Sequence, residues 1–199
     1  MRKISAFVRN TKGAMAAEFA LVLPILIIFL LGIMDVGYYA WAINRGEKAT
    51  QMGARWAVAT DMIPSGLATY SFASQGGISQ GTVVPISAFP GVTCRNTGCT
   101  CNGSCSFGTT ANTAAFDAIV SRMQDFKHNI EPANVEVEYS WSGLGYAGDP
   151  NGPDVAPIIT VRLVNLEHNP LYGILIGSVD LPDFAYSLTA EDGEGTFSH

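Results

Sequence analysis

The fold of this chain begins with residues 12–19, which read Lys-Gly-Ala-Met-Ala-Ala-Glu-Phe and lead directly into an apolar segment. The carboxylate of Glu18 stands at the head of a stretch that otherwise has the composition of a membrane span. An ionisable group at membrane depth is costly, so Glu18 is a functional candidate by default. Gly13 lies five residues before it, at the end of a basic leader.

The apolar segment 19–43 is 25 residues long and carries one formal charge, Asp35. At about 1.5 Å per residue, it is long enough to cross a hydrocarbon core roughly 30 Å thick. The leader 1–13 holds four basic residues and no acidic one, namely Arg2, Lys3, Arg9 and Lys12. Basic flanks stay on the cytoplasmic side of a membrane. The sequence therefore predicts a single-pass membrane protein with a cytoplasmic N-terminus and an exported C-terminal domain.

This N-terminal segment resembles the TadE-like pseudopilins of the Tad (tight adherence, Flp) pilus system, most strongly over residues 10–60. The resemblance is carried by the leader, by Gly13 with Glu18-Phe19 after it, by Leu-Val-Leu-Pro-Ile-Leu at 21–26, and by Gly-Ile-Met-Asp-Val-Gly at 32–37. At Asp35 the family more usually has glutamate. The resemblance implies a minor pseudopilin, processed by a prepilin peptidase and required for assembly of Flp pili in adhesion. Its implied partners are that peptidase, other pilins or pseudopilins, and inner-membrane pilus assembly proteins. The resemblance also implies that the span lies in the inner (cytoplasmic) membrane or in a pilus, with the C-terminal domain in the periplasm.

Three fates are open for the N-terminal segment. We favour a prepilin-type cut between Gly13 and Ala14, with the span retained. The second is an uncleaved signal anchor, which would leave an unprocessed single-pass protein whose periplasmic domain binds a partner. The third is a secretory signal removed after Ala42, where Ala-Trp-Ala matches the small-x-small cleavage pattern. Against the third, the apolar run exceeds a usual signal core and Glu18 interrupts its start.

Glu18 also has a physical role in an assembled bundle of such helices. Cleavage after Gly13 frees the amine of Ala14, and that ammonium can pair with Glu18 of a neighbouring subunit. An unpaired carboxylate is costly in an apolar environment, so the pairing favours staggered assembly. We assign Glu18 and Phe19 to subunit assembly and treat Asp35 as a second membrane acid. The alternative is that Glu18 lies at the headgroups and merely ends the span.

One helix is predicted from about residue 14 to residue 60, because no proline follows the span until Pro64. It comprises a membrane segment, 14–43, and a continuation, 44–63. Pro24 should kink or loosen the membrane half. In the continuation, an apolar stripe at helical spacing is predicted to pack on the chain's own domain or on neighbouring subunits. The stripe consists of Met52, Trp56, Ala59 and Ile63.

Segment 64–112 is predicted to be a loop or insertion rather than a packed element, because residues 71–112 are rich in Gly, Ser and Thr. It contains all four cysteines, and in the periplasm disulfides between them would persist. A Cys99–Cys101 bond would close a strained ring. Two pairings stay open, Cys94–Cys101 with Cys99–Cys105, and Cys94–Cys99 with Cys101–Cys105. Zinc is the competing interpretation, but the cysteine spacing does not match paired Cys-x-x-Cys ligands, so we expect no metal or other cofactor.

The rest of the chain, 113–199, is predicted to be an exported α+β domain. Periodicity indicates a helix over 113–129, strands over 135–140, 157–166 and 184–190, and a short helix or buried turn over 169–177. The expected fold is a long N-terminal transmembrane or spine helix followed by a small antiparallel sheet packed with helices, as in pilins.

The charge balance and the missing catalytic motifs argue against two classes of function, nucleic-acid binding and catalysis. Residues 46–199 hold six Lys and Arg against 15 Asp and Glu, a net charge of −9. This argues against nucleic acid, which needs a basic surface. His128, His168 and His199 lie outside recognisable catalytic motifs. We expect them to be solvated surface residues and the protein not to be an enzyme.

Overall fold

Residues 13–172 and 177–190 are described by the computed structural model, and the chain divides into two compact units. The first unit contains residues up to Trp41 together with the segment His168–Val179, and the second contains the remainder. The basic residues of the leader, the centre of the predicted turn at 169–177, and the C-terminal tail lie outside the described residues.

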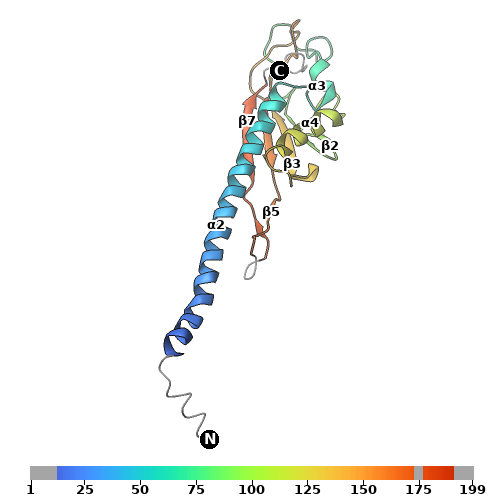
Figure 1. The fold of residues 1–199 in the computed structure, drawn as a ribbon. Coiled ribbons are helices and arrows are strands. Elements are labelled where there is room, and N and C mark those ends of the chain that lie inside the picture. The colour runs from blue at the N-terminus through green and yellow to red at the C-terminus, as the bar shows by residue number, and fades with distance from the viewer. Residues whose placement is uncertain (1–12, 173–176, 191–199) are drawn as a thin grey trace, which may run out of the picture. The chain divides into compact units, whose positions relative to one another are not determined.

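Helix α2 spans Ala14–Val58 and confirms the long N-terminal helix predicted from the sequence (Figure 1). Pro24 lies inside it, and the helix continues through this residue. A proline removes one backbone donor, but the turns on either side keep the segment helical.

The second unit contains a five-stranded antiparallel sheet in the order β2-β1-β3-β4-β7, with helices packed against it. Its strands are β1 (Val92–Arg95), β2 (Gly98–Cys101), β3 (Val135–Ser140), β4 (Ile158–Leu163) and β7 (Phe184–Thr189). Two short strands, β5 (Glu167–His168) and β6 (Val179–Asp180), form a separate pair. The α+β class is therefore confirmed, and β3, β4 and β7 lie within the predicted strand segments.

The helices beside the sheet are α3 (Ser65–Thr69) and α4 (Thr113–Gln124), with a 3-10 turn, η2, at Pro132–Asn134. Helix α4 begins where the sequence predicted, because the Asn112 side chain accepts a hydrogen bond from the backbone N–H of Ala115 at 3.1 Å. It ends five residues before the predicted end at Asn129.

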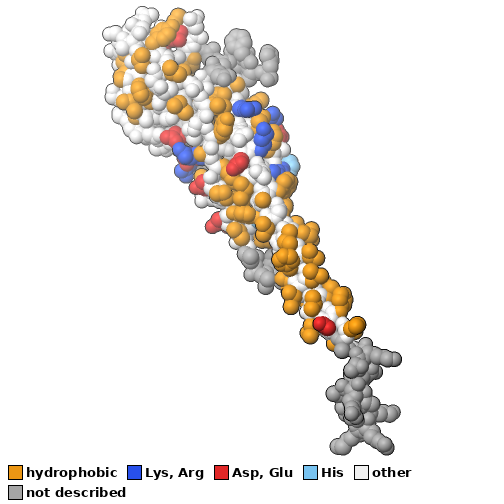
Figure 2. Space-filling model, turned by 90° about the vertical axis from the view of Figure 1, so that its left-hand side faces the viewer, with side chains coloured by type: hydrophobic (Ala, Val, Ile, Leu, Met, Phe, Trp, Pro, Cys, Tyr) orange, Lys and Arg blue, Asp and Glu red, His pale blue; other side chains and the backbone are white. Residues whose placement is uncertain are grey.

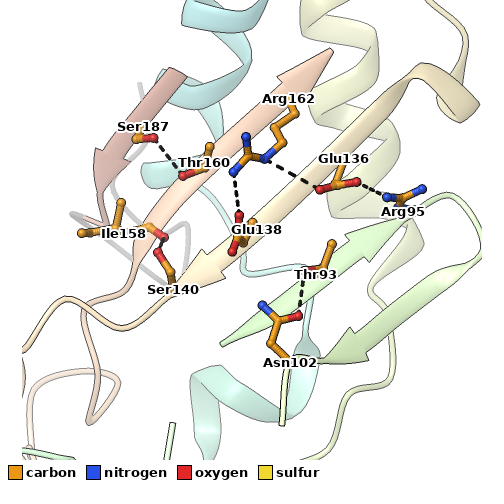
Figure 3. Close-up of polar contacts among 10 residues, drawn as sticks. All are labelled: Thr93, Arg95, Asn102, Glu136, Glu138, Ser140, Ile158, Thr160, Arg162 and Ser187. Atoms are coloured by element: carbon orange, nitrogen blue, oxygen red, sulfur yellow. Dashed lines mark hydrogen bonds and ion pairs between the residues drawn. The ribbon is translucent and has the colours of Figure 1, made fainter. Parts of the chain in front are cut away.

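Strand β3 shows how alternation separates the core from the polar face of the sheet. Val135, Val137 and Tyr139 are buried, whereas Glu136 and Glu138 alternate with them. On the polar face Arg162 bonds to Glu138 at 3.0 Å and lies 3.8 Å from Glu136 (Figure 3). Arg95 on β1 pairs with the same Glu136. Partly exposed ion pairs contribute little to the free energy of folding. These pairs nevertheless join side chains that the strand register brings together from β1, β3 and β4.

The core side of α2 differs from the predicted stripe. Trp56 is 37% exposed, and Met52 is only partly buried, although Ile63 is fully buried. The buried positions of α2 in the second unit are mostly small: Ala42, Gly46, Ala49, Thr50, Gly53, Ala54, Ala57 and Val58. Small residues allow close packing, and a Cβ at Gly46 would lie 2.5 Å from the Phe184 ring. The face of α2 that packs on the second unit is therefore the one whose small residues allow close approach, not the one with the largest apolar side chains.

Substitution of Gly53 tests this close packing. A Cβ at Gly53 would lie 2.7 Å from Met123 Cγ and 3.4 Å from Val161 Cγ1. Overfilling a packed site costs about 1–3 kcal/mol, so we expect Gly53→Leu to lower the free energy of unfolding by about 2 kcal/mol. Denaturant unfolding of the full chain in detergent measures it.

Gly37→Leu is the matched control, because a Cβ at Gly37 in the same helix meets no atom within 4 Å. If the two variants unfold at the same denaturant concentration, the Gly53 contact does not constrain the packing.

Segment 64–112 differs from the predicted unpacked loop. It supplies α3, β1 and β2, and its side chains Leu67, Phe72, Val84, Phe89 and Phe107 are buried. The Gly, Ser and Thr content correctly marks turns, but widely spaced aromatic residues provide a packed core between them. Phe107 lies 6.1 Å from Phe72 and 5.7 Å from Phe89 between ring centroids.

The buried hydroxyl of Tyr139 connects the sheet to the chain after α2. It accepts a hydrogen bond from the backbone N–H of Ile63 at 3.0 Å. Burial raises the pKa of Tyr139 far above its ordinary value, and the hydrogen bond from Ile63 only partly opposes this. The side chain is therefore a neutral, fully buried part of the core.

Candidate functional site on helix α2

The first half of α2 exposes apolar side chains on all sides. No residue of its most apolar 18-residue window is buried within the structure. Phe19 is 65% exposed, and Ile25 and Val36 are each 70% exposed. Hydrophobic side chains continue along this part of the helix in Figure 2. A helix that is apolar all round belongs in a membrane or inside an assembly, and α2 is long and apolar enough to cross a bilayer.

The predicted processing and assembly residues lie at the start of this helix. Gly13 immediately precedes α2, and Ala14 is its first residue. A Cβ at Gly13 would meet no atom within 4 Å, so packing among the described residues does not require glycine there. Glu18 and Phe19 are exposed. Glu18 lies four residues after Ala14, so the two positions share one face of the helix.

Asp35 has partners that the sequence did not reveal. Its Oδ1 accepts hydrogen bonds from the backbone N–H of Leu171 at 2.8 Å and of Tyr172 at 3.2 Å. Both residues belong to the first unit with Asp35. Asp35, within the candidate span, therefore holds a turn from the distant C-terminal part of the chain.

An aromatic cluster lies next to this contact. The His168 ring is 4.8 Å from that of Tyr38 and 5.4 Å from that of Tyr39, and Tyr38 stacks on Trp41 at 5.5 Å. His168 is only 5% exposed, so its prediction as a solvated residue was wrong. His128, in contrast, is exposed, and His199 lies outside the described residues.

The predicted short helix or buried turn at 169–177 is also corrected where it is described. Leu171 and Tyr172 lie in a bend and are 57% and 37% exposed, while residues 173–176 lie outside the described residues. The available signal was an apolar run in an otherwise polar region. Its partner Asp35 lies 136 residues away from Leu171, and the periodicity of a sequence reports only on residues within one helix or strand.

All four cysteines form disulfides in one of the two open pairings. Cys94 bonds to Cys99, directly opposite it in the β1–β2 register, and Cys101 bonds to Cys105. The first bridge closes the hairpin, and the second lies at the end of β2. In the described ranges, no group of three or more His, Cys, Asp or Glu residues is placed to hold a metal ion.

Thiol counting tests the bridges. Unfolded, non-reduced protein purified from cells should show no free thiol, because both pairs are oxidised. After reduction, four thiols should titrate. Four thiols before reduction, or zinc bound in a fixed ratio, would contradict the disulfide assignment.

An exposed apolar helix that could span a membrane, followed by an antiparallel sheet packed with helices, defines an α+β protein with a candidate membrane anchor. Residues 13–55 match the family model described as TadE-like protein. The resemblance seen in the sequence is thus confirmed over this segment, which covers the exposed half of α2 and most of its continuation. No significant match was found among curated proteins or among solved structures.

Proposed function

We propose that this protein is a minor pseudopilin of a Tad (Flp) pilus system, cut after Gly13 by a prepilin peptidase and required for pilus assembly in adhesion. The TadE-like match over residues 13–55 carries the proposal. After the helix, the chain also has a folded domain, whereas the major Flp pilins are little more than the N-terminal helix.

Two local features support the processing step. Gly13 is exposed and meets no spatial restriction, so a requirement outside the fold accounts better for glycine at this position. The bond after it joins two small residues, Gly13 and Ala14, at the point where α2 begins.

The orientation rests on charge and on redox chemistry. The leader is basic and precedes the span, which favours a cytoplasmic N-terminus. Disulfides persist in oxidising compartments, and both cysteine pairs are bonded. We infer that residues 46–199 lie in the periplasm and that the helix is either in the inner membrane or in a pilus.

The role is structural rather than catalytic. The cysteines are committed to disulfides, and His168 packs among tyrosine rings. The inferred partners are the prepilin peptidase, other pilins or pseudopilins, and inner-membrane pilus assembly proteins. Each of them would meet the exposed first half of α2.

Two measurements on the same strain test the function. Deleting the gene for this protein should abolish surface pili, and expressing the protein again should restore them, as counted by electron microscopy. Mass spectrometry of the membrane-extracted protein should find Ala14 as the N-terminus.

An N-terminus at Met1 would indicate an unprocessed anchor, and one at Ile43 a secreted domain. Normal piliation in the deletion strain would refute the assembly role.

A further inference from the structure

The depth of Asp35 follows from the helix geometry. Seventeen residue steps separate Glu18 from Asp35, which is about 26 Å along a helix. With Glu18 at the inner boundary of a core roughly 30 Å thick, Asp35 lies just short of the outer boundary. Tyr38, Tyr39 and Trp41 come at the following turn, where aromatic belts meet the headgroups.

The Leu171–Tyr172 turn is held at the same depth. The two hydrogen bonds to Asp35 fix its backbone, and the packing of His168 on Tyr38 and Tyr39 fixes the strand that leads to it. All these residues belong to the first unit. The turn therefore cannot be placed independently of the span.

The side chains of this turn suit a lipid surface. Leu171 is 57% exposed and Tyr172 is 37% exposed, and segment 169–178 contains no charged residue. The backbone N–H groups of Leu171 and Tyr172 are both satisfied by Asp35, which removes their share of the cost of bringing this turn out of water. Tyrosine, with an apolar ring and a polar hydroxyl, is favoured at the membrane interface.

We propose that the Leu171–Tyr172 turn is a second membrane contact, held by Asp35 against α2 and inserted into the outer-leaflet interface of a phospholipid bilayer. The turn contacts the boundary between lipid headgroups and acyl chains, because it lies beside the aromatic end of the span. The proposal rests on the membrane insertion of α2 inferred above. It gives Asp35 a role other than assembly, as the residue that positions the turn.

Depth-dependent fluorescence quenching tests the contact in the full-length protein. The native cysteines are all bonded, so Leu171→Cys provides a single free thiol for an environment-sensitive fluorophore. Liposomes of phosphatidylcholine and phosphatidylglycerol would carry a nitroxide either near the headgroup or near the end of the acyl chain. We expect the shallow nitroxide to quench the label at residue 171 more than the deep one does.

Two further labelling sites separate this proposal from membrane insertion itself. Ile27→Cys lies within the span and should be quenched most by the deep nitroxide, whereas Val83→Cys, an exposed residue of the second unit, should not be quenched. Quenching at 27 without quenching at 171 would overturn the turn contact and leave insertion standing. No quenching at residue 27 would refute the membrane insertion of α2 and, with it, the lipid contact of the turn.

Asp35 variants test how the turn is held. Asp35→Ala removes the acceptor and should abolish most of the quenching at residue 171 while leaving that at residue 27. Asp35→Asn retains an oxygen acceptor and should preserve most of it. Unchanged quenching in Asp35→Ala would overturn the role of Asp35. If quenching at residue 171 is absent at a high protein-to-lipid ratio and rises only as the protein is diluted in lipid, a second copy of the chain, not the bilayer, covers the turn in the undiluted state, and the proposed lipid contact is overturned.

Discussion

Glu18→Gln should stop or greatly slow pilus assembly while the processed protein accumulates in the membrane. Glu18 is exposed near the start of α2, on the same helical face as Ala14. In the proposed bundle its carboxylate pairs with the freed Ala14 amine of a neighbour. Leaving one partner of a desolvated pair alone costs about 3–5 kcal/mol, which corresponds to a loss of more than about a hundredfold in association.

The measurement combines pilus counts with the state of the protein. The Glu18→Gln protein should carry an Ala14 N-terminus, because the leader and the cleavage site are unchanged, but cells should have few or no pili. Glu18→Asp retains the charge on a shorter arm and should restore assembly only in part. Normal pili in the Glu18→Gln strain would show that the carboxylate only marks the membrane boundary.

Gly13→Leu should block processing and leave the full-length chain in the membrane. A Cβ at residue 13 meets no atom within 4 Å, so leucine has no steric reason to disturb the described fold. The expected loss therefore belongs to recognition by the peptidase rather than to stability. Mass spectrometry should find the Met1 N-terminus in place of Ala14, and pili should be lost.

A fold measurement makes the Gly13 result specific. The unfolding midpoint of Gly13→Leu in detergent should equal that of the unprocessed parent chain. Gly32→Leu provides a matched control, because this glycine is also exposed with no atom near its Cβ, and that variant should be cleaved normally. An Ala14 N-terminus in the Gly13→Leu protein would show that the cut does not depend on this glycine.

Much of the candidate site could be predicted without the structure because it depends on local chemistry. The apolar span, Gly13 and Glu18 follow from composition and spacing within 45 residues of the N-terminus. Nothing in such a pattern reports that Asp35 meets Leu171, since these residues are 136 positions apart. The turn at Leu171 was visible as an apolar run, but its exposure reversed the expectation of burial.

What the sequence by itself determined is therefore the long helix, the alternation of β3, and the TadE-like segment. Each of these depends on neighbouring residues and a single period. The tertiary structure alone decided the buried face of α2, the inclusion of β1 and β2 in the sheet, and the choice between two cysteine pairings. The physical reason is that packing depends on which distant surfaces fit closely. Gly53 could approach Met123 and Val161 only because it has no side chain, and hydrophobicity along the chain does not encode that fit.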